Sequence, residues 1–153
     1  MFKQIIVPID GSSCADQAVD VAAALAKEQN ATCTVVMVVD IAQAAALGFA
    51  TPDLVNGWLE TVQDQARAVV DDAAARLRAQ GVSVQTEVAE GNPTDAILQV
   101  AKKRRGDLIV MGSHGRSGLR RLFLGSVAEA VLRSADIPVL VVRQSGLKAV
   151  RAA

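Results

Sequence analysis

Short, continuous runs of apolar residues alternate along the chain with longer stretches in which apolar residues recur every three or four positions. Residues 5–9, 33–39 and 108–111 are such runs, typical of strands that are buried on both faces of a parallel sheet. Residues 82–88 alternate apolar and polar side chains instead, which predicts an edge strand, and 138–142 is predicted to be the last strand.

The segments between these strands show the periodicity of helices. Ser12 or Ser13 caps a first helix, and a long helix is predicted from about Trp58 to Ala79. Asn92-Pro93 begins the next helix, and the last one spans 126–134. Residues 41–56 show the least regular pattern, so we expect a mobile loop there with a helical turn.

The alternation of strands and helices predicts an α/β domain over residues 1–143. We expect a single five-stranded, parallel, doubly wound sheet of Rossmann-like type, in the order 3-2-1-4-5, with helices on both faces. Residues 144–153 are weakly patterned and are predicted to form a flexible C-terminal tail.

Composition limits the classes of partner. The chain has 16 basic and 16 acidic residues, and it has one Trp, three Phe and no Tyr. Neither a basic surface nor an aromatic platform is available, so we expect no nucleic-acid and no membrane partner. No apolar stretch is long enough for a signal peptide or a membrane span, which favours the cytoplasm. Cys14 and Cys33 lack metal-type spacing and are expected to be reduced structural thiols, and no metal site is predicted.

The predicted sheet places a ligand where the strand order reverses, beyond the carboxyl ends of the first and fourth strands. The first strand ends at Asp10 and the fourth at Gly112. The segment that begins with this glycine is Gly112-Ser113-His114-Gly115, and it is followed by nine residues and then by Gly125-Ser126.

This glycine loop has the residue types of a phosphate cradle. Glycine N–H groups can surround an anion, and the helix that starts at Ser126 favours negative charge at its N-terminus. Arg116, Arg120 and Arg121 lie between the glycines and can neutralise phosphate. The alternative is that the glycines only form a tight turn and a close helix–strand contact. The dinucleotide-binding G-x-G-x-x-G and the P-loop motif are absent.

These residues resemble the universal stress protein family. Gly112-x-x-Gly115, nine residues and Gly125-Ser126 match its ATP-binding signature, and the similarity extends over about residues 2–143. Further matches are Ile5-Ile6-Val7-Pro8-Ile9-Asp10-Gly11-Ser12, Gly91-Asn92-Pro93, 107–115 and 138–142.

The resemblance implies an adenine nucleotide, ATP with Mg²⁺ or Mn²⁺, and assigns its contacts to individual residues. Asp10 would act on the ribose or through the divalent metal. Val38 would hold adenine through its backbone, and Met111 would pack on the base or ribose. Pro8, Val38 and Met111 would fit equally well as ordinary core residues. His114 is expected to be an exposed polar residue of the loop, with a phosphate contact as the alternative. The implied site residues are Pro8, Ile9, Asp10, Val38, Met111, Gly112, Gly115, Arg116, Gly125, Ser126 and Val127.

The predicted function is that of an ATP-binding regulatory protein of the stress response, acting as a nucleotide-dependent homodimer. Pairing through the last strand, 138–142, is expected because its edge carries no charge before Arg143. The alternatives are a slow ATP-hydrolysing enzyme and an interaction module that binds AMP or cyclic AMP. We expect no enzyme beyond slow hydrolysis, because Asp10 and His114 are the only candidate bases and no second acidic residue is placed to hold a catalytic metal. The residues do not indicate a protein partner.

Overall fold

The computed structural model describes residues 1–48, 51–115 and 124–143, and its five strands form one parallel sheet. Their order across the sheet is β3-β2-β1-β4-β5, which confirms the predicted topology. The strands are β1 (Gln4–Ile9), β2 (Thr32–Val39), β3 (Ser83–Glu90), β4 (Leu108–Gly112) and β5 (Val139–Val142). The helices are α1 (Ser13–Gln29), α2 (Ala42–Ala46), α3 (Pro52–Ala79), α4 (Pro93–Lys103) and α5 (Ser126–Ser134).

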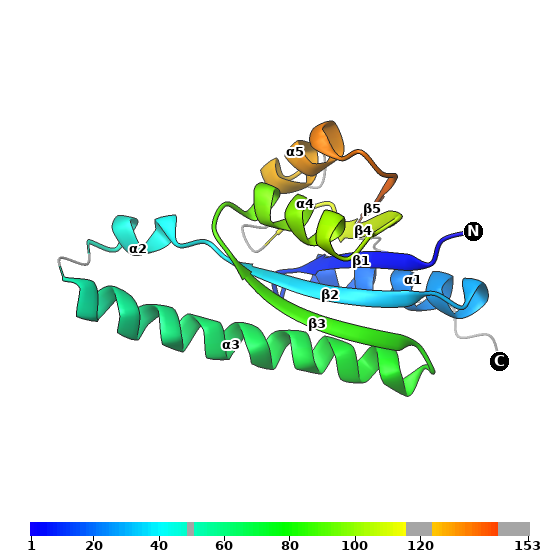
Figure 1. The fold of residues 1–153 in the computed structure, drawn as a ribbon, viewed down its shortest axis with the longest axis horizontal. Helices are drawn as coiled ribbons and strands as arrows, with labels where there is room; N and C mark the ends of the chain where they lie inside the picture. The colour runs from blue at the N-terminus through cyan, green and yellow to red at the C-terminus, as the bar shows by residue number, and fades with distance from the viewer. Residues whose placement is uncertain (49–50, 116–123, 144–153) are drawn as a thin grey trace.

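Helices cover both faces of this sheet (Figure 1). Ile5 and Val7 of β1 pack into one hydrophobic cluster with α1 and α3. Ile6 points to the other face and packs with α4 and α5. All three side chains are fully buried. Because both faces of the strand are covered, its positions 5–9 are all apolar, and this explains the continuous runs in the sequence.

Capping side chains set the starts of α1 and α4 as predicted. The Ser12 hydroxyl accepts a hydrogen bond from the Ala15 N–H at 3.2 Å. The Asn92 side chain accepts from the N–H groups of Thr94 and Asp95 at 3.0 and 3.2 Å. Both caps satisfy backbone donors that a helix leaves unpaired in its first turn.

Within residues 41–56 the expected helical turn is present as α2, whereas the predicted start of the long helix is wrong. The helix α2 covers residues 42–46, and α3 begins at Pro52 rather than near Trp58. Thr51 caps α3 by accepting from the Leu54 N–H at 3.5 Å, and Pro52 occupies the first turn, where its missing N–H costs nothing. Glycine and proline suggested a loop, whereas here the proline starts a helix.

The charged residues of the edge strand β3 are held by neighbouring helices. Lys103 and Arg104 of the α4 end lie 2.8 and 2.7 Å from the two carboxylate oxygens of Glu87. Burial opposes ionisation of this carboxyl, but the hydrogen bonds from the two cations hold its pKa below the usual value. This network attaches α4 to the outer edge of the sheet.

The two cysteines are free and buried. Burial raises the pKa of the Cys33 thiol to about 11, so the thiol stays protonated and unreactive at neutral pH. This agrees with the prediction of reduced structural thiols. Among the described residues, no helix is both long and apolar enough to cross a membrane. The predicted tail, 144–153, lies outside the described residues.

Candidate functional site

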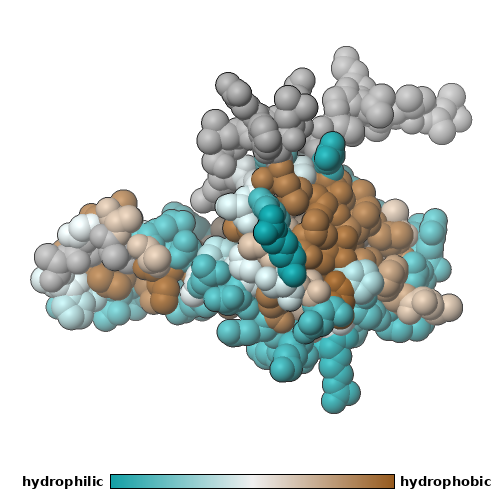
Figure 2. All heavy atoms as spheres, turned by 90° about the horizontal axis from the view of Figure 1, so that it is seen from above, coloured by the Kyte–Doolittle hydropathy of each residue, from teal (hydrophilic) through white to brown (hydrophobic). Residues whose placement is uncertain are grey.

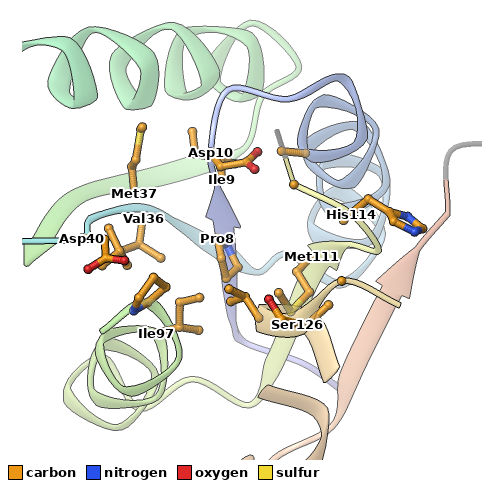
Figure 3. Close-up of a pocket in the computed structure, with 18 of the residues that line it drawn as sticks. Pro8, Ile9, Asp10, Val36, Met37, Asp40, Ile97, Met111, His114 and Ser126 are labelled. Carbon is orange, nitrogen blue, oxygen red and sulfur yellow. The ribbon is translucent and has the colours of Figure 1, made fainter. Parts of the chain in front are cut away.

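A cavity of about 320 Å³ opens at the carboxyl ends of β1, β2 and β4, between the starts of α4 and α5 (Figure 3). Parallel strands end at the same edge of the sheet, so this is where the reversal of strand order was expected to place a ligand. The volume lies in the range of small-molecule sites. The lining residues are Pro8, Ile9, Asp10, Ala15, Val36, Met37, Val38, Asp40, Gln43, Pro93, Ile97, Met111, Gly112, Ser113, His114, Gly115, Gly125, Ser126, Val127 and Ala128.

Backbone hydrogen bonds fix both ends of the glycine loop. The Ser113 N–H donates to the Val142 carbonyl at 2.8 Å, which ties the loop to the end of β5. The Gly125 N–H donates to the Ser113 carbonyl at 2.7 Å, which brings the far end of the loop back to its start. Gly112 and Gly125 therefore lie close together in space although twelve residues separate them in the sequence.

The start of α5 is open towards the cavity. Gly125 occupies the position before the helix and gives it no side-chain cap. The N–H groups of the first turn have no partner within the helix and can therefore bind an anion, and the helix dipole favours negative charge there. Ser126 adds a hydroxyl at the same place, and both Ser126 and Val127 line the cavity.

Asp10 lies between the first strand and the glycine loop. Its carboxylate accepts a hydrogen bond from the Ser12 N–H at 3.0 Å, which sets its direction. The second carboxylate oxygen lies 2.7 Å from the point where a Cβ on Gly115 would stand. Only glycine leaves room for this carboxylate beside the loop.

The opposite end of the cavity is apolar. Figure 3 shows Met37, Val36 and Ile97 on one side of Pro8, and Met111 and Ser126 on the other. The register of the sheet explains the first group, because Pro8 pairs with Val36 and Ile9 with Met37. The cavity thus joins an apolar slot to a polar loop, with Pro8 between them.

Asp40 and Gln43 lie at the edge of the apolar slot, at the start of α2. One carboxylate oxygen of Asp40 accepts from the Ala42 N–H at 3.0 Å and so begins this helix. Asp10, Asp40 and His114 are the only ionisable residues among the described lining residues.

His114 points away from the apolar slot in Figure 3. Its Nδ1 lies 2.9 Å from the Ser113 hydroxyl, and its Nε2 is buried with no hydrogen-bond partner among the described residues. The histidine is half-buried rather than exposed. Its visible role is to hold the fully buried Ser113 side chain, whose hydroxyl also lies 3.6 Å from the Cys14 sulfur.

The structure brings the predicted site residues together in this one cavity, except Arg116, which lies outside the described residues. Sequence reasoning missed the apolar slot. A usable signal was available, because the end of β2 and the Asn92-Pro93 helix start both lie at the carboxyl edge of the sheet. The residues present in the cavity but not predicted are Ala15, Val36, Met37, Asp40, Gln43, Pro93, Ile97 and Ala128.

Comparison with known proteins decides the family. The model of the universal stress protein family matches residues 1–143. The chain belongs to this family. Among curated relatives, universal stress protein MJ0531 of Methanocaldococcus jannaschii is 37% identical over 145 residues, which cover 94% of this chain and 84% of that protein.

Solved structures of universal stress proteins and their relatives have the same fold. The structure of protein MJ0577 of the same archaeon superposes with a TM-score of 0.85 at 26% identity, over 96% of this chain and 99% of that one. A universal stress protein solved in complex with cAMP superposes with a TM-score of 0.70 at 27% identity, over 94% and 98% of the two chains.

Proposed function

We propose that this universal stress protein is an ATP-binding regulatory protein of the cytoplasm. The observation that carries the proposal is a single cavity with an apolar slot at one end and an uncapped helix start with a glycine loop at the other. An adenine base fits the apolar slot beside Val36, Met37 and Ile97, and its phosphates fit the N–H groups of the first turn of α5. The ribose then lies over Pro8, near Asp10.

A divalent cation fits this arrangement. Mg²⁺ is commonly held by one or two carboxylates together with the phosphates of a nucleotide. Asp10 supplies one carboxylate beside the loop. The described residues contain no group of three His, Cys, Asp or Glu side chains that could hold a metal by themselves. We therefore expect Mg²⁺ or Mn²⁺ to bind with the nucleotide, where it would neutralise phosphate charge.

Substitution of Ser126 tests the position of the phosphates. We expect Ser126→Ala to weaken ATP binding about tenfold, because a hydrogen bond to a charged group is lost. Isothermal titration calorimetry with Mg·ATP measures the change. Ser134→Ala, at the other end of the same helix, is the matched control and should keep the wild-type affinity. Equal affinities for the two variants would contradict the assignment.

A second candidate ligand is AMP or cyclic AMP, since one solved relative is in complex with cAMP. The sequence favours ATP, because the three arginines between Gly115 and Gly125 supply charge for more than one phosphate. Calorimetry with ATP, AMP and cAMP separates the two. ATP should bind at least about tenfold more tightly than AMP, which corresponds to about 1.4 kcal/mol. The reverse order would favour the second candidate.

We further propose that the protein binds ATP without rapid turnover. Asp10, Asp40 and His114 are the only described ionisable groups in the cavity, and His114 already contacts Ser113. Among the described residues, Asp10 and Asp40 are the only carboxylates that line the cavity, and Asp40 lies at its apolar end (Figure 3), so it is not placed to hold a catalytic metal with Asp10. Phosphate release at about 1 s⁻¹ or faster, a modest rate for an enzyme, would overturn this.

The last part of the proposal is a homodimer formed by β5. This strand lies at the edge of the sheet, and Leu140 at its centre is 38% exposed. Figure 2, seen from above Figure 1, shows hydrophobic residues gathered over the half of the molecule that carries α5 and β5. An apolar edge strand is a template for pairing with another strand. Two copies related by a two-fold axis would join their sheets there.

A charge on this edge tests the dimer. We expect Leu140→Glu to halve the mass measured by size-exclusion chromatography with light scattering, because two carboxylates would face each other across the axis. Ser83→Glu, on the other edge strand, is the matched control and should leave the mass unchanged. A wild-type protein with the same mass as Leu140→Glu would contradict this interface.

A further inference from the structure

A small cluster of polar side chains lies buried behind the glycine loop. Its centre is Ser113, which is 1% exposed, and Thr34 of β2 is the only other buried polar residue among the described residues. Burying a hydroxyl costs free energy unless its hydrogen bonds are made. The Thr34 hydroxyl has no partner among the described residues, whereas the Ser113 hydroxyl lies 2.9 Å from Nδ1 of His114 and 3.6 Å from the Cys14 sulfur.

Ser113 also connects three segments that surround the cavity. Its N–H donates to the Val142 carbonyl at the end of β5, and its carbonyl accepts from Gly125 before α5. Its hydroxyl contacts Cys14 in the first turn of α1, and the Cys14 sulfur donates to the same Val142 carbonyl at 3.4 Å. Every polar group of Ser113 is therefore used at the place where the loop leaves β4.

These contacts determine where the protons of the cluster lie. A carbonyl oxygen only accepts, so the Cys14 thiol gives its single proton to Val142. The sulfur then accepts from the Ser113 hydroxyl, and the hydroxyl, which has no second proton, accepts from Nδ1 of His114. The neutral ring thus carries its proton on Nδ1. The buried Nε2 has no partner among the described residues, and an unpaired acceptor is tolerated more often than an unpaired N–H.

The cluster lies directly behind the groups that face the proposed phosphates. Gly115 follows His114 and stands beside the Asp10 carboxylate, and Gly125 precedes the uncapped start of α5. Glycine allows the backbone many conformations, and fixing them at the moment of binding would weaken the affinity. A loop that is already held in the binding-competent form avoids this loss.

We propose that Ser113 is the positioning residue of the nucleotide site, because its hydroxyl, held between His114 and Cys14, keeps the glycine loop in the form that binds phosphate. At 1% exposure it offers almost no surface to a ligand, so it acts through the loop and not by contact. The inference rests on the proposed ATP site. It also gives His114 a role as a support behind the loop, which agrees with the ring pointing away from the apolar slot (Figure 3).

Ser113→Ala tests this role by calorimetry with Mg·ATP on the full-length protein. We expect binding to weaken about tenfold, because the loss of one hydrogen bond lowers the fraction of protein whose loop is binding-competent. Thr34→Val is the matched control, because it removes the other buried hydroxyl, which does not line the cavity, and it should keep the wild-type affinity. If Ser113→Ala binds ATP as tightly as Thr34→Val, the positioning role is wrong.

The position of the imidazole proton gives a second test, which needs no nucleotide. His114 is the only histidine of the chain, so long-range proton–nitrogen correlation spectra contain a single imidazole. At about pH 8, where a free imidazole is neutral, the wild-type ring should carry its proton on Nδ1. Ser113→Ala should lose this preference, since the acceptor of Nδ1 is gone, and Thr34→Val should keep it. A general loss of stability would not move the proton. A wild-type ring with its proton on Nε2 would overturn the proposal.

The wild-type protein separates this inference from the proposed function. If wild type shows no heat with Mg·ATP, the proposed function fails, and the role of Ser113 in ATP binding fails with it. If wild type binds ATP and Ser113→Ala binds equally well, the proposed function stands and only the positioning role is lost.

Discussion

Gly115→Val is expected to abolish most ATP binding while the protein stays folded. The valine Cβ would stand 2.7 Å from an oxygen of the Asp10 carboxylate. Asp10 is a side chain and can turn away, so the sheet is not disturbed. The valine would then fill the space beside the loop that phosphates need, and the affinity should fall about 100-fold, or ~2.7 kcal/mol.

Calorimetry and thermal unfolding together check this result. The variant should unfold within a few degrees of the wild type and show little heat with Mg·ATP. Gly57→Ala is the control, because its site is open and Gly57 does not line the cavity. An affinity for ATP within threefold of the wild-type value would show that the loop does not hold the phosphates.

The same substitution three residues earlier, at Gly112, should lower the stability of the fold instead. A Cβ on Gly112 would stand 3.0 Å from the Cys14 carbonyl carbon and 3.1 Å from the Ala15 nitrogen. Both atoms belong to the backbone of α1 and cannot move aside alone. We expect Gly112→Val to lower the free energy of unfolding by about 3 kcal/mol, as overpacking of a tight contact does.

Urea denaturation measures this loss. Gly115→Val is the natural comparison, because it places the same side chain in the same segment without backbone contact. If both variants unfold at the wild-type urea concentration, the approach of α1 to the end of β4 is looser than described.

The fold was predictable from the sequence because both faces of the sheet are covered. Ile5, Ile6 and Val7 are apolar in succession for this reason, and such runs identify parallel strands. The alternation of these strands with helices then favours the doubly wound order. That order in turn places Asp10 opposite Gly112. The polar half of the candidate site could therefore be predicted with no structure.

The apolar half of the site could not be predicted in the same way. Whether Met37 reaches the cavity depends on the register of β2 against β1, and Ile97 depends on how α4 lies over the sheet. Neither the register of β2 nor the placement of α4 can be recognised from the sequence of these segments. The early start of α3 was missed for another reason, because Thr51 and Pro52 resemble a loop until the helix that they start is seen.

The hydrogen bond from the Gly125 N–H to the Ser113 carbonyl lets the segment between them vary without changing the fold. It closes the loop at its base through backbone atoms only, whatever side chains lie between Gly115 and Leu124. Lengthening a loop with fixed ends is inexpensive, at about 0.6 kcal/mol for each doubling. Evolution can therefore change the length and charge of this segment, and with it the choice of ligand, while the sheet and α5 remain as they are.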